Sequence, residues 1–161
     1  MPSLRVVNQP PQRSAALLDH VWRRIRLRSE GALAPLGLRS RHVLALTVLR
    51  DRGPSEQQDL ARIIEMDGTN VVGLLNDLEA GGLVERRRSP TDRRRHVVQI
   101  TRKGANMLAK AEFALGAVED EVLCALDRKQ RETLYSLLQQ ATSAHPRTAT
   151  ETCTEEPSPG S

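Results

Sequence analysis

Arginine is concentrated in one short part of this sequence, where it can bind phosphate groups. Residues 83–103 hold eight basic residues against two acids, whereas the whole 161-residue chain has a formal charge of only +4. Arginine supplies 21 of the 24 basic residues, and its planar guanidinium forms bidentate contacts with phosphates or carboxylates. A local excess of this kind is typical of a surface that binds a polyanion. The alternative is a hairpin whose arginines are merely solvated.

Asp92 and Arg94 stand two residues apart within this basic segment, and their pairing suggests a more specific role. An arginine in a narrow minor groove of DNA lies in an enhanced negative potential, and a nearby carboxylate can hold its guanidinium in one orientation. We therefore predict that Arg94 enters a minor groove and that Asp92 orients it. The other arginines are predicted to neutralise backbone phosphates, which gives affinity without sequence information: Arg86, Arg87, Arg88, Arg93 and Arg95.

A second candidate surface lies on a short helix predicted at about 69–80, with Asp67 as its N-terminal cap. Helical periodicity turns four apolar residues inward: Val71, Leu74, Leu75 and Leu78. The outer side carries short residues that can approach or hydrogen-bond to base edges: Thr69, Asn70, Gly73, Asn76 and, at the margin, Val72. The alternative is that Thr69 and Asn70 are ordinary polar residues of a first helical turn.

The elements around these two surfaces are predicted from apolar periodicity and from capping residues. The first is an amphipathic helix at about 14–30. Ser40 can cap a second helix that stops at the Gly53-Pro54 pair, and a Ser-x-x-Gln capping box at 55–58 begins a third. Two β-like segments, at 83–87 and 96–100, form a hairpin whose tip is rich in arginine.

After the hairpin, Thr101 can cap a long helix to about Leu126, and a final helix follows at about 128–141. The long helix has one apolar stripe and a second apolar side about half a turn away, formed by Phe113, Ala117 and Cys124. A monomer of this size has difficulty covering both sides, so we expect a partner subunit to cover one of them.

The order of these elements is that of a winged helix-turn-helix, in which the second helix of the motif enters the major groove. The predicted fold class is therefore mainly α with a small β-hairpin wing and with N- and C-terminal dimerisation helices. We expect one domain at 14–141, with the winged helix-turn-helix at 39–104 between dimerisation helices at 14–36 and 105–141. The polar tails at 1–13 and 142–161 are expected to be disordered.

The stretch from about Arg39 to Gly104 resembles the MarR family of transcriptional regulators. The resemblance rests on three motifs, which are Leu78-Glu-Ala-Gly-Gly-Leu-Val-Glu-Arg86, Asp92-Arg-Arg94 and Ile100-Thr101-Arg-Lys-Gly104. Only Ile100 departs from the family pattern, which has a leucine there. With the flanking helices included, the resemblance covers about residues 14–141.

The resemblance implies a homodimer that binds a pseudo-palindromic operator in double-stranded DNA, usually as a repressor. It also implies release of the DNA when a small molecule binds between the dimerisation helices and the DNA-binding lobe. Asp92 and Arg94 match the family's wing pair. Because Gly73 stands where many members have an arginine, the expected base readout moves towards Thr69 and Asn70. Ser40, at the start of the second helix, is counted with the same DNA-binding surface.

A small-molecule site is predicted around the first helix. Trp22 is the only tryptophan and lies near Arg26, so the two can stack on and neutralise an aromatic or phenolic acid. His42 can line the same cleft. The alternative is that Trp22 belongs to the core of a dimer, which is the commoner role for a tryptophan on an apolar helical stripe.

The sequence contains no arrangement that predicts catalysis. The histidines and the two cysteines, Cys124 and Cys153, lack the spacing of metal ligands, and no nucleophile pair, phosphate loop or cofactor fingerprint occurs. We therefore expect a protein that is not an enzyme and that has no cofactor and no metal. No membrane span or export signal is evident, so we expect a cytoplasmic location, at the nucleoid through DNA binding.

Two other kinds of winged-helix protein stay open as alternatives. One is a module that binds protein or RNA without operator specificity, although RNA binding usually needs exposed aromatic side chains. The other is the dimerisation lobe of an enzyme such as a small-molecule methyltransferase, which requires a catalytic domain that residues after 142 are too few to form.

Overall fold

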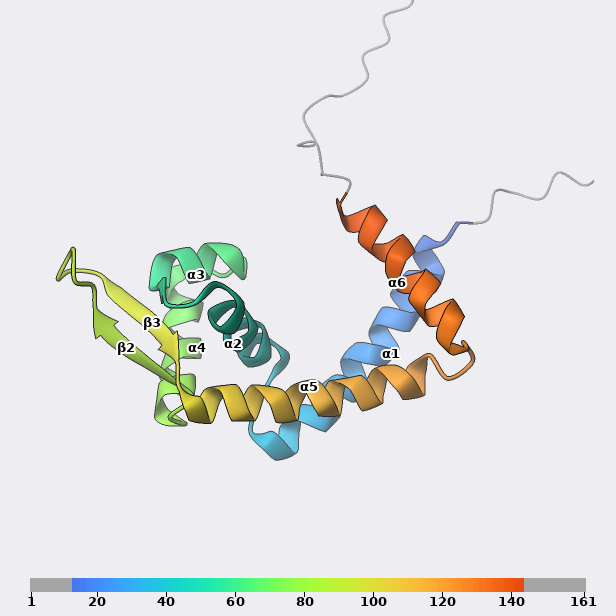
Figure 1. Cartoon of the computed structure of the whole chain (residues 1–161), viewed down its shortest axis with the longest axis horizontal. Coiled ribbons are helices and arrows are strands. Elements are labelled where there is room, and N and C mark those ends of the chain that lie inside the picture. The colour runs from blue at the N-terminus through green and yellow to red at the C-terminus, as the bar shows by residue number, and fades with distance from the viewer. Residues whose placement is uncertain (1–12, 144–161) are drawn as a thin grey trace, which may run out of the picture. The chain divides into compact units, whose positions relative to one another are not determined.

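Helices make up most of residues 13–143, the part of the chain that the computed structural model describes (Figure 1). In chain order the elements are α1 (Ala15–Leu33), η1 (Ala34–Leu36), α2 (Ser40–Arg52), β1 (Ser55–Glu56), α3 (Gln57–Ile63), α4 (Gly68–Ala80), β2 (Val84–Arg88), β3 (His96–Ile100), α5 (Arg102–Val122) and α6 (Arg128–Ser143). The predicted fold class, mainly α with a small β wing, is confirmed. The chain divides into two units after Val122, so α6 lies in a unit of its own.

The core of the first unit is built on the inward sides of α2 and α4. All four residues predicted to turn inward from α4 are buried, as are Val43, Leu46 and Leu49 of α2. Each fully buried leucine contributes about 1.5–3 kcal/mol. The inward face of α4 therefore holds this helix in place. Its outer face, which carries the candidate base-reading residues, does not contribute to the core.

The sheet has three antiparallel strands in the order β1-β3-β2, one more than the predicted hairpin. β1 pairs Ser55 with Val98. The predicted capping box at 55–58 is wrong, because the Ser55 hydroxyl donates to the carbonyl oxygen of Gly53 at 3.0 Å and leaves the start of α3 without a side-chain cap. A strand of two residues is too short to be seen as periodicity in the sequence.

The junction between the sheet and α5 requires the Thr101 and Gly104 of the sequence motif. The Thr101 hydroxyl donates to the carbonyl oxygen of Gly82 at 2.6 Å and accepts from the amide of Gly104 at 3.0 Å, which confirms it as the cap of α5. A Cβ atom on Gly104 would lie only 2.0 Å from the carbonyl oxygen of Leu83. Only glycine fits this close approach of α5 to the chain before β2.

Two helix boundaries differ from the prediction. Arg39, not Ser40, is the N-cap of α2, because the backbone amide of Arg39 donates to Nδ1 of His42 at 3.0 Å. His42, at the third helical position, thus takes the role that a glutamate or glutamine has in a capping box. α5 ends at Val122 instead of Leu126, so Cys124 lies in a turn and is exposed.

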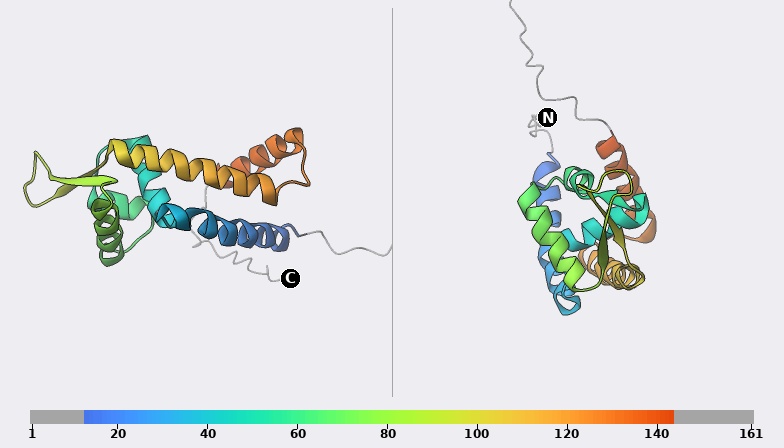
Figure 2. Two further views of the ribbon diagram at one scale, coloured as in Figure 1. Left: turned by 90° about the horizontal axis from the view of Figure 1, so that it is seen from below. Right: turned by 90° about the vertical axis from the view of Figure 1, so that its left-hand side faces the viewer.

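Within the first unit, α1 and α5 pack side by side, as the two views in Figure 2 show. α1 nevertheless leaves Leu17, Leu18 and Trp22 exposed, and Phe113 of α5 is 83% exposed. α6, in the second unit, exposes Tyr135, Leu137 and Leu138. None of the described helices is long and apolar enough to cross a membrane. The tails predicted to be disordered lie outside the described residues, except at their inner ends.

Candidate nucleic-acid interface

The outer face of α4 presents the short residues that the sequence predicted. Thr69, Asn70, Gly73 and Asn76 are all exposed, and so is Val72 at the margin. Thr69, Gly73 and Asn76 are spaced four and three residues apart, so they form one stripe along the helix. This stripe is about 10 Å long at the rise of an α-helix, which matches roughly three base-pair steps.

Asp67 caps α4, as predicted. Its Oδ1 accepts from the backbone amide of Asn70 at 2.9 Å, and its Oδ2 accepts from the side-chain Nδ2 of the same asparagine. The hydrogen bond from the Asn70 backbone, above all, holds the pKa of the Asp67 carboxyl below its ordinary value. The start of the helix is therefore fixed, and one side of the Asn70 carboxamide is already engaged.

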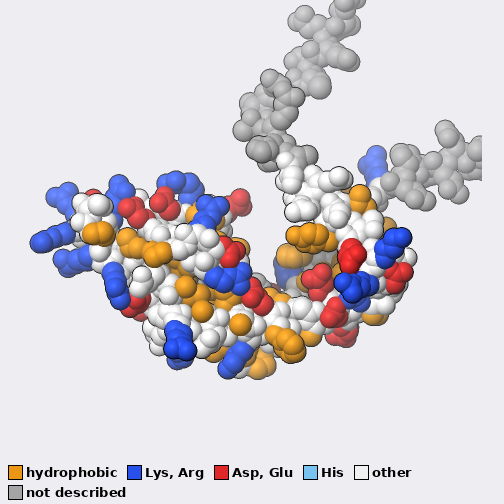
Figure 3. All heavy atoms as spheres, in the orientation of Figure 1, with side chains coloured by type: hydrophobic (Ala, Val, Ile, Leu, Met, Phe, Trp, Pro, Cys, Tyr) orange, Lys and Arg blue, Asp and Glu red, His pale blue; other side chains and the backbone are white. Residues whose placement is uncertain are grey.

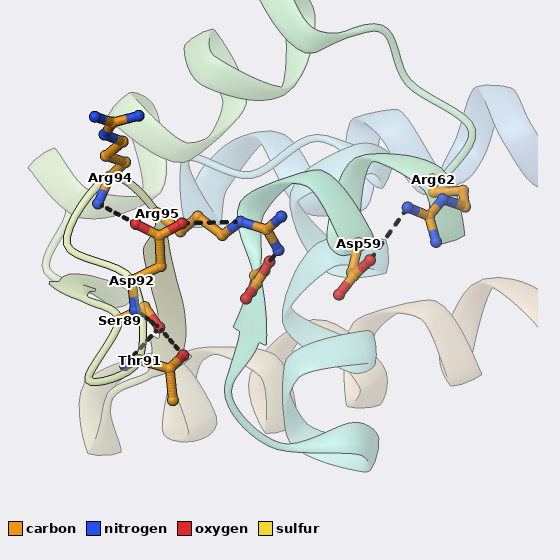
Figure 4. Close-up of polar contacts among 8 residues, drawn as sticks. Asp59, Arg62, Ser89, Thr91, Asp92, Arg94 and Arg95 are labelled. Atoms are coloured by element: carbon orange, nitrogen blue, oxygen red, sulfur yellow. Dashed lines mark hydrogen bonds and ion pairs between the residues drawn. The ribbon is translucent and has the colours of Figure 1, made fainter.

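The wing tip, residues 89–95 between β2 and β3, is a loop built around a buried serine (Figure 4). Ser89 is only 5% exposed, and its hydroxyl oxygen accepts from the amides of Thr91 at 3.3 Å and Asp92 at 3.4 Å. The Ser89 amide also donates to the carbonyl oxygen of Arg95 at 2.9 Å and closes the loop. The wing tip is thus ordered by its own hydrogen bonds.

Asp92 has a different role from the one predicted. Its Oδ1 accepts from the backbone amide of Arg94 at 2.9 Å, and its Oδ2 lies 3.6 Å from Nε of Arg95. The carboxylate therefore shapes the backbone under Arg94 and approaches the guanidinium of Arg95. Figure 4 shows the Arg94 side chain pointing away from Asp92. Asp92 and Arg94 are two residues apart, and this spacing suits an Asx-type turn better than a contact between their side chains.

Arg95 and Arg86 are both tied to other elements. Nη1 of Arg95 donates to Oε2 of Glu56 at 2.9 Å, which joins the wing tip to β1. Arg86 donates to Oε2 of Glu79 from Nε at 3.0 Å and from Nη2 at 2.7 Å, and its Nη2 also donates to Oδ1 of Asn76. The Arg86 guanidinium lowers the pKa of Glu79 below its ordinary value. These two arginines position the wing and α4 rather than standing free.

The remaining wing arginines leave a positively charged surface at the hairpin end of the first unit (Figure 3). Arg87 pairs with Glu85, at 2.9 Å. Within residues 13–143, the guanidinium groups of Arg88, Arg93 and Arg94 make no hydrogen bond or ion pair. These three side chains are available to an external anion, and they lie at the far end of the hairpin whose strand β2 packs on α4.

A cleft of about 1360 Å³ opens between α1, α2, α4 and α5. It brings together all three residues predicted to bind a ligand: Trp22, Arg26 and His42. Ser40 and part of the outer face of α4 line it too, including Asn70 and Gly73. The predicted ligand residues and the predicted base-reading residues are therefore neighbours, which the sequence alone did not indicate.

His42 connects this cleft to α4. Its side chain is nearly buried, with Nδ1 accepting from the Arg39 amide and Nε2 lying 3.5 Å from Oδ2 of Asp77. Trp22, in contrast, is 59% exposed at the edge of the cleft. No group of three or more histidine, cysteine, aspartate or glutamate side chains in residues 13–143 is placed to hold a metal ion.

Sequence reasoning missed four residues that support the interface: Glu56, Asp77, Glu79 and Ser89. Glu79 carried a detectable signal, because it lies seven residues before Arg86 across the turn that brings β2 back along α4. No pattern in the sequence indicated Glu56 or Asp77, because their partners, Arg95 and His42, are 39 and 35 residues away in the chain.

These features define the class of the protein, which is a winged helix-turn-helix protein. Residues 36–95 match the model described as MarR family. A protein of Thauera aromatica, described as a transcriptional regulatory protein for the hcr operon, is 34% identical over 95 residues. That match covers 59% of this chain and 57% of the relative. The resemblance to the MarR family is confirmed.

Solved structures of MarR from E. coli have the same fold. The wild-type apo form is 22% identical, with a TM-score of 0.72, and the match covers 83% of this chain and 99% of that one. A mutant MarR complexed with operator DNA is also 22% identical, with a TM-score of 0.66 and coverage of 80% and 93%. At this identity the two likenesses concern the fold alone.

Proposed function

We propose that the protein is a sequence-specific DNA-binding transcriptional regulator, with α4 in the major groove and the wing in the minor groove. The observation that carries the proposal is that the first unit presents two free surfaces. One is the exposed stripe of Thr69, Gly73 and Asn76, and the other is the ordered wing tip with its unpaired Arg94. A helix face that reads bases and arginines that bind phosphates are the two parts that such recognition needs.

The comparisons support this proposal by analogy. The matched family consists of transcriptional regulators and not enzymes, and the E. coli MarR mutant was solved with operator DNA. For this chain, Arg94 of the wing is proposed to enter the minor groove, while Arg88 and Arg93 contact phosphates. Ser40, exposed at the start of α2, is proposed to lie against the DNA backbone near Thr69.

The active form is proposed to be a homodimer in one domain, residues 14–141, held by helices at 14–36 and 105–141. The exposed apolar side chains of α1, α5 and α6 support this, because a stable monomer rarely leaves so many exposed. A two-fold symmetric dimer presents two copies of α4 and so fits a pseudo-palindromic operator. Repression is the proposed outcome, with the protein in the cytoplasm at the nucleoid.

A small aromatic or phenolic acid is the proposed effector, bound in the cleft lined by Trp22, Arg26 and His42. Its carboxylate or phenolate would pair with Arg26, and its ring would stack on Trp22. Because His42 faces both the cleft and Asp77 of α4, a ligand there can shift α4 relative to α2 and weaken DNA binding.

The proposal is tested by a fluorescence-anisotropy titration of the protein against DNA from upstream of its own gene, with excess random DNA as competitor. Saturable binding that survives the competitor, at one dimer per palindrome, is the expected result. Binding that random DNA abolishes at every upstream fragment would favour a module for another polyanion or for protein. Salicylate, added as a simple aromatic acid probe, is expected to release the DNA from the wild type but not from Arg26→Ala.

A further inference from the structure

The two asparagines on the outer side of α4 are each held by a charged neighbour, and the two neighbours have opposite sign. Asn76 Oδ1 accepts from Nη2 of Arg86, whereas Asn70 Nδ2 donates to Oδ2 of Asp67. A guanidinium has donors only and an ionised carboxylate has acceptors only. Each contact therefore fixes which end of the carboxamide faces the neighbour.

Fixing one end of a carboxamide also fixes what its other end presents. Because the carbonyl oxygen of Asn76 faces Arg86, its Nδ2 group faces outward as a donor. Because the Nδ2 group of Asn70 faces Asp67, its carbonyl oxygen faces outward as an acceptor. Neither outward group has a hydrogen-bond partner among the described residues.

The neighbours that hold Asn70 and Asn76 are themselves anchored. Arg86 lies in β2 with a side chain only 21% exposed, and Glu79 of α4 accepts two hydrogen bonds from it. Asp67 is fixed by the backbone amide of Asn70. Rotating either carboxamide would place like against like, an oxygen on a carboxylate or an amino group on a guanidinium, so the orientations are set before DNA arrives.

We propose that Arg86 and Asp67 are specificity-determining positioning residues, which make Asn76 select an acceptor base edge and Asn70 a donor base edge. Guanine offers two acceptors, N7 and O6, in the major groove, whereas cytosine and adenine each offer an amino donor. Adenine N7 and thymine O4 are acceptors too, but only guanine has two side by side, so Asn76 favours guanine. The usual two-point pairing of asparagine with adenine is weakened, because the oxygen of Asn76 is engaged. This inference rests on the proposed function of α4 in the major groove.

The test is selection of binding sites from a pool of random duplexes by full-length variants, with sequencing of the bound DNA. Asn76→Asp keeps the contact with Arg86 but presents an outward acceptor. At the one position of each half-site that Asn76 contacts, this variant is expected to prefer cytosine where the wild type prefers guanine. The enrichment of the preferred base over the other is expected to be about five- to hundredfold. Arg86→Met keeps an apolar stem but frees the carboxamide of Asn76. At the same position of the aligned selected sequences, which we call a column, adenine is then expected to appear beside guanine.

Two matched variants separate this effect from a loss of folding or of affinity. Asp67→Ser keeps a helix cap but releases the Asn70 carboxamide, and it is expected to broaden a different column. Arg93→Ala, which loses a phosphate contact, is expected to lower affinity and leave every column unchanged. Thermal melting of each variant verifies that it is folded before selection.

Unchanged columns for Asn76→Asp and Arg86→Met, with merely weaker binding, would overturn the inference and leave the proposed function standing. A wild-type pool from which no sequence is enriched would overturn the proposed function, and this inference with it. A shift in the predicted column alone supports both.

Discussion

Arg94 is the residue on which minor-groove recognition depends. Its backbone is held by Asp92, while its guanidinium has no partner in the described part of the chain. We predict that Arg94→Ala weakens operator binding by roughly 10- to 100-fold, because a charge-assisted contact is lost. Anisotropy titrations measure the effect, and gel filtration verifies that the oligomer persists. Affinity equal to wild type would remove the wing from the mechanism.

Arg93→Ala is the matched control for that substitution, since it removes an equally free charge from the same loop. Arg93→Ala should lower the affinity for operator and for random DNA by the same factor. The slope of the logarithm of the binding constant against the logarithm of the salt concentration should become shallower by about one. If Arg93→Ala changed the preference between operators instead, Arg93 would be reading bases and the division of roles between the two arginines would be wrong.

Acid should weaken the attachment of α4 to its surroundings. Asp67 and Glu79 have pKa values below their ordinary 3.8 and 4.5, so their stabilising contribution is present above those values and is lost as the pH falls through the lowered ones. We predict that the urea midpoint of the wild type falls between pH 5 and pH 3, and that Glu79→Gln flattens this fall. An identical pH profile for the variant would show that the Arg86 contact adds no stability.

The candidate site was predictable from the sequence where a residue acts on its own, and not where it acts through a distant partner. The outward stripe of α4 follows from helical periodicity, so the exposure of Thr69 and Asn76 was predicted correctly. The roles of Arg86 and Asp92 were not, because a count of charges cannot tell a free arginine from one paired across a turn. Local backbone geometry, such as the Asp92 contact to an amide, is likewise hidden from side-chain reasoning.

Gly104 holds the joint between the sheet and α5 by lacking a side chain. We predict that Gly104→Ala destabilises the protein by about 1–3 kcal/mol, because its Cβ would overlap the carbonyl oxygen of Leu83. Gly116→Ala is the control, since a Cβ there meets nothing within 4 Å and α5 should gain about 0.5–1 kcal/mol. Urea unfolding measures both, and equal effects of the two substitutions would contradict this account of the joint.

At the scale of elements, the long periodic helices were predicted well and their ends less well. α4 and the start of α5 follow from strong caps at Asp67 and Thr101. The end of α5 was overestimated, because apolar residues continue through the turn after Val122. The third strand, β1, was missed since its two residues are fixed by pairing with β3, a contact made across more than 40 residues of chain.

Phe113 tests the proposed dimer, because it is the most exposed large apolar side chain on α5. Its loss from a symmetric interface counts twice, so Phe113→Asn is predicted to weaken dimerisation by roughly 100-fold or more. Leu44→Asn, at an exposed leucine on α2, should leave the dimer intact. Sedimentation velocity over a concentration series makes the comparison. Equal dissociation constants for the wild type and Phe113→Asn would show that this face of α5 is not the interface.

The central claim, that α4 reads a major groove while the wing lies in a minor groove, is tested most directly by dimethyl sulfate protection of the bound operator. The reagent methylates guanine N7 in the major groove and adenine N3 in the minor groove. We expect the wild type to protect guanines within each half-site and adenines at its flank. Arg94→Ala is expected to lose the protection of the adenines and to keep that of the guanines. Protection in only one groove, or loss of both signals together at saturating Arg94→Ala, would contradict it.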